Sequence, residues 1–81
     1  MVVQYILKDK MPKIDIRGYW DYTQWWVNIH VLGGERVFSE PKEGDIISFK
    51  GNSYRVIHVK EDKGRARWYK EDFFYVFVLK Y

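Results

Sequence analysis

The chain of 81 residues contains no cysteine, which excludes disulfides and thiolate-bound metals from the forces that stabilise it. No stretch approaches the roughly 18 consecutive apolar residues that a membrane-spanning helix needs. The first residues carry neither the basic region nor the small-residue cleavage site of a secretory signal. A disulfide scaffold and a helical membrane protein are therefore excluded, and we expect a cytoplasmic protein.

Helical patterning is also scarce. No segment repeats apolar residues with a 3.6-residue period between capping signals, and only residues 68–72 allow one short helix. Five or six short strands at regular spacing predict a single all-β domain over residues 1–81, folded as a small antiparallel barrel whose closure removes exposed edges. The extended patterns lie at residues 2–8, 24–32, 35–39, 46–49, 54–59 and 73–81.

The clearest hairpin pattern covers residues 43–59. An apolar run ends at Phe49, and a second β-branched run begins at Tyr54. Gly51 and Asn52 lie between the two runs and tolerate the positive φ of a tight turn. This stretch therefore predicts two antiparallel strands at the middle of the chain.

Two further features organise the strands around this hairpin. Gly33 and Gly34 predict a second two-residue hairpin turn, after a strand that begins at Gln24. The last strand is apolar on both faces, which is typical of a central strand or one that closes a barrel. Alternation along the strands predicts a core of Ile6, Val27, Ile29, Val31, Ile47, Val56, Val59, Val76 and Val78.

The segment GDIISFKGNSYRVIHV, which begins at Gly44, resembles the middle hairpin of small Src-homology-type (SH3-like) barrels. In those proteins Gly-Asp opens one strand and Tyr-x-Val-x-x-Val forms the next, here from Tyr54 to Val59. Such barrels occur in small phage-encoded proteins, in ribosomal and chromatin-associated modules and in peptide-binding domains. The resemblance implies an SH3-like architecture, and a five-stranded OB-like barrel is the alternative. The acidic positions of the proline-peptide binders have no counterpart here, so that activity is not implied.

Positive charge is concentrated in one part of the chain. Residues 50–70 contain seven basic and two acidic residues, a net charge of +5, whereas the whole chain carries +3. Basic side chains interleaved with aromatic ones are typical of proteins that bind single-stranded nucleic acid, because cations attract the backbone and rings stack on bases. The candidate nucleic-acid-binding residues are Lys50, Arg55, Lys63, Arg65, Arg67, Trp68 and Tyr69. The alternative is a solvated loop in which Trp68 covers one end of the barrel.

A second candidate surface is a cluster of large aromatic residues between residues 19 and 26. Adjacent residues of a strand face opposite sides, so these side chains cannot all belong to the core. Such rings are favoured at protein interfaces, which predicts a partner protein or a second copy of the chain as the ligand. The candidate protein-binding residues are Tyr19, Trp20, Tyr22, Trp25 and Trp26. The alternative is a lid over one mouth of the barrel.

Catalytic and metal-binding patterns are missing. The only histidines, His30 and His58, lie in separate strands with no acidic residue at a ligand spacing, and are expected to be ordinary strand residues. The chain has no nucleophile–base spacing and no glycine-rich phosphate loop. The sequence therefore predicts a non-catalytic binding module without a cofactor. Nucleic acid is the first candidate ligand, and a protein partner, as for a small phage-encoded inhibitor, is the second.

Overall fold

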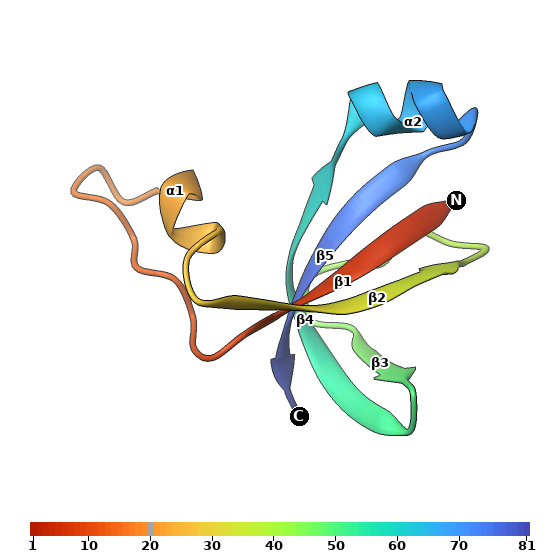
Figure 1. Ribbon diagram of the computed structural model, residues 1–81. Helices are drawn as coiled ribbons and strands as arrows, with labels where there is room; N and C mark the ends of the chain where they lie inside the picture. The colour runs from red at the N-terminus through yellow and green to blue at the C-terminus, as the bar shows by residue number, and fades with distance from the viewer. Residues whose placement is uncertain (20) are drawn as a thin grey trace.

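The computed structural model describes residues 1–19 and 21–81, except for the side chain of Tyr22. Five strands form one sheet in the order β2-β1-β5-β4-β3, which curls into a half-barrel (Figure 1). Two short helices lie outside the sheet. The elements are β1 (Val2–Lys8), α1 (Tyr22–Trp25), β2 (Ile29–Arg36), β3 (Ile46–Phe49), β4 (Asn52–Glu61), α2 (Lys63–Tyr69) and β5 (Phe73–Lys80).

The prediction of a small all-β fold with five strands is confirmed, and two details differ. The sheet is mixed, because β1 and β5 run parallel while the other neighbouring strands are antiparallel. The described residues also form two short helices where the sequence predicted at most one. The parallel pair places β5 between β1 and β4. The expectation that the last strand is central is therefore correct.

Both faces of β5 are buried, and each belongs to a different core cluster. Val76 and Val78 point to the first cluster, together with Val3, Tyr5, Phe49, Tyr54, Val56 and Phe74. Phe77 points to the opposite face, where it packs with Ile6 and Trp25 in the second cluster. Because successive strand residues face opposite sides, one uniformly apolar strand supplies both clusters.

Four members of the predicted core, Ile6, Val56, Val76 and Val78, are buried as expected, and Ile29, Ile47 and Val59 are half-buried. Val27 and Val31 are exposed, so their assignment to the core was wrong. The predicted strand from Gln24 is instead interrupted by α1 and by Asn28, whose φ of 53° breaks the extended backbone. β2 then forms an edge of the sheet, where its outward face stays in water.

The predicted hairpin turn at Gly33 and Gly34 was also wrong. Both glycines lie inside β2, which continues to Arg36 alongside β1. The register of this pair shifts between Tyr5 and Ile6, opposite Gly33, whose φ of 134° suits glycine. A Cβ at Gly33 would lie 3.3 Å from the Phe49 ring. The glycines thus let an irregular edge strand curve against the core, and they do not reverse the chain.

The central hairpin is confirmed, with its turn one residue earlier than predicted. Phe49 pairs with Asn52, and the two residues between them, Lys50 and Gly51, have φ of 50° and 83°. Positive φ at both central positions is the pattern of the type I′ turn, which favours Asn-Gly. Lys50 therefore occupies a position that asparagine suits better.

Replacing Lys50 with asparagine is expected to raise the free energy of unfolding by about 0.5 kcal/mol, because asparagine tolerates a positive φ at lower cost than lysine. Urea denaturation followed by circular dichroism measures the change. Lys50→Ala removes the same charge without supplying a turn residue, and serves as the control. If the two variants had equal free energies of unfolding, any increase over the wild type would come from the lost charge, and the turn assignment would be contradicted.

Candidate binding surface

The basic segment forms α2, and this changes the arrangement expected from the sequence. The Asp62 carboxylate accepts a hydrogen bond from the backbone N–H of Arg65 at 3.0 Å and starts the helix. The helix therefore begins five residues earlier than the predicted start at Trp68. If the residues before Trp68 were extended, Arg65 and Arg67 would share a side. In the helix they are about 200° apart, and Arg65 shares a side with Trp68.

Seven aromatic rings form a continuous row from α2 to α1, which we call the aromatic row. Residues Phe73, Tyr75 and Phe77 alternate along β5 and supply one face of the sheet. Neighbouring ring centroids are 4.8, 5.5, 5.3, 5.2, 5.1 and 5.3 Å apart. In order, the row is Trp68, Tyr69, Phe73, Tyr75, Trp26, Phe77 and Trp25.

Exposure changes along this row. Trp68 is 77% exposed at its α2 end, and Trp26 is 40% exposed near the other end. Trp25, the last ring, is 0% exposed. Buried rings thus anchor the row to the sheet, and exposed rings offer flat apolar faces to a ligand.

Two cationic side chains lie against the row, one over a buried ring and one over a partly exposed ring. The Arg65 guanidinium lies 5.8 Å from the centroid of the Phe73 ring. The Lys60 ammonium lies 5.8 Å from the centroid of Trp26. Both distances fall within the roughly 6 Å of a cation–π contact. A positive charge therefore lies beside each of these two rings.

A groove of about 550 Å³ opens where α1, β4, α2 and β5 meet. Trp26 and Tyr75 form its aromatic wall. Its polar lining carries two lysines and two carboxylates, so the formal charges balance. The lining residues are Trp26, Lys60, Glu61, Asp62, Lys63 and Tyr75.

Asp62 is held in place at this groove. One carboxylate oxygen accepts the backbone N–H of Arg65, and the other accepts the Tyr75 hydroxyl at 3.1 Å. The backbone hydrogen bond from Arg65 is the main cause that lowers the pKa of Asp62 below its usual value, and the Tyr75 hydroxyl acts in the same direction. Asp62 is therefore ionised at neutral pH, and its side chain is an acceptor only.

The structure brings together most of the predicted nucleic-acid-binding residues. Lys63, Arg65, Arg67, Trp68 and Tyr69 all lie on α2. Lys50 and Arg55 lie on the β3–β4 hairpin, at the opposite end of the molecule from α2 (Figure 1). The two groups cannot form one compact surface.

The predicted protein-binding cluster is divided in the structure. Trp25 is buried in the core, so the expectation that it belongs to a contact surface was wrong. Trp26 lines the groove beside α2. Tyr19 is exposed on the loop before α1. Trp20 and the side chain of Tyr22 lie outside the described residues.

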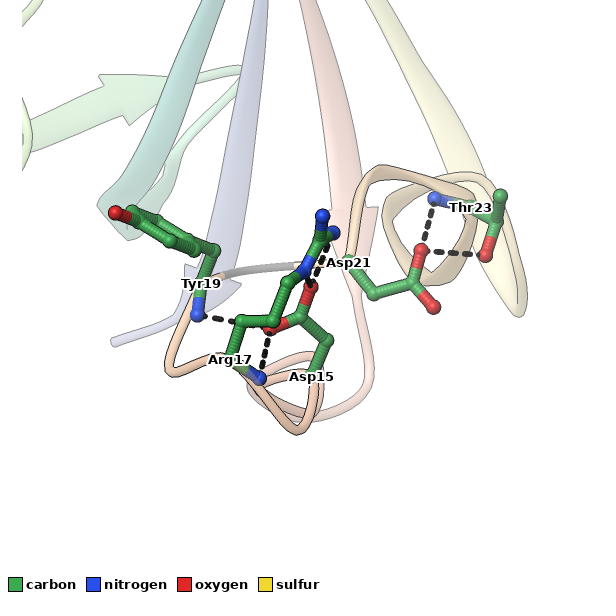
Figure 2. A network of polar contacts seen from close by, with 5 residues as sticks. All are labelled: Asp15, Arg17, Tyr19, Asp21 and Thr23. Atoms are coloured by element: carbon green, nitrogen blue, oxygen red, sulfur yellow. Dashed lines mark hydrogen bonds and ion pairs between the residues drawn. The ribbon is translucent and has the colours of Figure 1, made fainter.

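The loop that carries Tyr19 is ordered by Asp15. Figure 2 shows the Asp15 carboxylate accepting the backbone N–H groups of Arg17 and Tyr19, at 2.9 and 3.0 Å, and pairing with the Arg17 guanidinium. Asp21 accepts both the backbone N–H and the hydroxyl of Thr23 and starts α1. These local bonds hold Tyr19 on the loop that projects beyond α1, away from α2 (Figure 1).

Sequence reasoning missed four residues of the groove, Lys60, Glu61, Asp62 and Tyr75. Only Tyr75 carried a usable signal, because it alternates with Phe73 and Phe77 and therefore shares their face. Lys60, Glu61 and Asp62 line one groove with Trp26 only because the junction of β4 and α2 lies beside the end of α1. That proximity is tertiary and leaves no local pattern.

The two histidines lie apart, on β2 and β4, which are separated in the sheet by β1 and β5. Within residues 1–19 and 21–81, no group of three or more His, Cys, Asp or Glu side chains is placed to hold a metal ion. No helix among these residues has the length and apolar character needed to cross a membrane.

Comparison with known protein families, curated proteins and solved structures found no match.

Proposed function

We propose that this protein is a non-catalytic module that binds single-stranded nucleic acid along α2 and the adjoining groove. The observation that carries the proposal is the aromatic row, which combines exposed rings at Trp68 and Trp26 with two cations, Lys60 and Arg65, against rings of the same row. Stacking on rings gives sequence-tolerant affinity, and the cations neutralise phosphates. The local excess of positive charge in residues 50–70 supports the same ligand.

The arrangement favours a single strand over a duplex. The faces of Trp68 and Trp26 can stack only on bases that have left a double helix. Lys63 and Arg67 are four residues apart on α2 and share a side, where they can contact consecutive phosphates. The strand would therefore place its bases over the rings and its backbone along the basic side of α2.

A protein partner is the second candidate ligand, on a different surface. Ile16 and Tyr19 are exposed on the loop before α1, which projects away from α2 (Figure 1). Large exposed apolar side chains are typical of protein contacts. An apolar protein interface responds weakly to salt, whereas binding through phosphate contacts weakens steeply as salt rises. A salt series therefore separates the two candidates.

Replacing Trp68 with alanine is expected to weaken oligonucleotide binding by about 1–3 kcal/mol, because one stacking ring is lost. The salt dependence of binding should be retained, since stacking releases no counterions. Titration of a fluorescent oligo-dT at several salt concentrations measures both quantities. Tyr81→Ala, which removes an exposed ring beside the β3–β4 hairpin, is the matched control. Equal losses for the two variants would contradict the proposed site.

Replacing Arg67 with alanine is expected to reduce the slope of log affinity against log salt by about one unit, because one phosphate contact is lost. Arg55→Ala changes the formal charge equally at the far end of the sheet and should leave the slope unchanged. The same titration measures both variants. A reduced slope in Arg55→Ala alone would move the site to the β3–β4 hairpin. No binding by the wild type at low salt would overturn the proposal.

A further inference from the structure

We infer that the groove beside Trp26 is a pocket for a single nucleobase and that it selects guanine. The inference rests on the proposed function and adds the identity of one base to it. The groove volume of about 550 Å³ lies within the roughly 300–1,000 Å³ of small-ligand sites. The groove lining carries equal numbers of positive and negative side chains, whereas all the charged side chains within α2 are basic. Contacts to phosphates position a strand, whereas contacts to base edges specify it.

The stacking surface of this pocket is Trp26. Two other rings, Tyr75 and Phe77, pack nearly perpendicular to it and fix its orientation, with interplanar angles of 85° and 77°. The Lys60 ammonium lies above the Trp26 ring. Because a lysine side chain is long and flexible, it can move aside to a phosphate or to the base edge when a base stacks on this ring.

The hydrogen-bonding surface of the pocket is Asp62. One oxygen accepts the Arg65 backbone N–H, and the other accepts the Tyr75 hydroxyl and lies 3.6 Å from the Arg65 guanidinium Nε. A carboxylate has about four acceptor positions, so each oxygen can accept one further hydrogen bond. The Watson–Crick edge of guanine carries two adjacent donors, N1–H and the N2 amino group. These donors match the two oxygens of one carboxylate. Guanine O6, beside N1, is an acceptor, and Lys60 and Lys63 on the groove lining supply the donors.

The other bases fit this set of groups less well. Adenine and cytosine present one amino donor beside a ring nitrogen acceptor, which would face the second carboxylate oxygen. Thymine and uracil present one donor between two carbonyl oxygens. In each case an acceptor of the base meets an acceptor of the protein, and an unmatched buried acceptor weakens binding. Only guanine satisfies both oxygens of Asp62.

The test compares oligo-dT strands that carry one central dG, dA or dC, titrated against the same protein at one salt concentration. The wild type is expected to bind the dG strand about tenfold more tightly than the dA strand, as for one good bidentate contact to a base. Asp62→Asn should bind both strands about equally. Asparagine is also a good N-cap, so α2 should be retained, and far-ultraviolet circular dichroism checks this.

Glu40→Gln is the matched control, because it changes the formal charge equally at an exposed position that does not line the groove, and it should keep the preference for dG. Trp26→Ala provides a second variant and should also lose the preference. Equal binding of all three strands by the wild type would overturn the inference and leave the proposed function standing. A preference that persists in Asp62→Asn would also overturn it. No binding of any strand would overturn the inference and the proposed function together.

Discussion

Replacing Trp25 with alanine is expected to lower the free energy of unfolding by about 3–5 kcal/mol, as for large aromatic residues in cores generally. Trp25 is 0% exposed and is the largest fully buried side chain among the described residues. Its ring stacks on His58 at 4.4 Å and meets the edge of Phe77 at 5.3 Å. Small domains have only about 5–15 kcal/mol of stability, so this variant should unfold at much lower urea concentrations.

Trp26→Ala is the matched control for this prediction, because it removes a neighbouring indole that is 40% exposed. It should lower the free energy of unfolding by about 1 kcal/mol and reduce oligonucleotide binding. Urea denaturation followed by circular dichroism measures the stability of both variants. If Trp25→Ala unfolded at the same urea concentration as Trp26→Ala, the burial of Trp25 on this face of the sheet would be contradicted.

The strands that could be predicted from the sequence are those whose signal is local. β1 was predicted with its observed bounds, Val2–Lys8, because apolar residues on both of its faces mark an extended segment. The β3–β4 hairpin was found because turn residues separate two apolar runs. The central place of β5 followed from its apolar composition on both faces. In each case side-chain alternation and turn chemistry within a few residues were sufficient.

The segment from Gln24 to Asn28 was wrongly predicted to be part of a strand, because its alternation imitates one. Val27, Ile29 and Val31 alternate with polar or aromatic residues, as an amphipathic strand would. The decisive interactions come from distant residues instead. Trp25 packs against Phe77, and Lys8 binds two carbonyls of this segment. Tertiary contacts therefore override a local pattern, which is common where strand and helix propensities are close.

The candidate groove shows the same limit for function. The sequence separated Trp26, assigned to a protein interface, from Lys63, assigned to nucleic acid. The structure places both on one groove because the end of α1 lies beside the junction of β4 and α2. The α2 residues could be found in advance because they are consecutive. The groove could not be predicted from the sequence, because Trp26 comes from the end of α1 whereas its other lining residues come from β4, α2 and β5.

Lys8 connects the stability of the fold to the proposed site, and replacing it with methionine is expected to impair both. Lys8 is buried, and its ammonium donates hydrogen bonds to the backbone carbonyls of Gln24, at 2.9 Å, and of Val27. Burial lowers the pKa of Lys8 from its ordinary value. These carbonyls lie on either side of Trp26 along the chain, so Lys8 holds the segment that forms the groove wall.

Methionine keeps most of the apolar stem of Lys8 but leaves the two carbonyls without their donor. Hydrogen bonds to charged groups contribute about 1.5–3 kcal/mol each, and the relieved burial of the charge offsets part of the loss. We expect Lys8→Met to lower the free energy of unfolding by about 2–3 kcal/mol, and to weaken oligo-dT binding because Trp26 is no longer held. Lys10→Met removes an equal charge from an exposed position and should change neither quantity appreciably. Equal unfolding midpoints of the two variants in urea would show that the Lys8 contacts do not stabilise this segment. If Lys8→Met lowered the free energy of unfolding but left oligo-dT binding unchanged, Lys8 would not be needed to position Trp26.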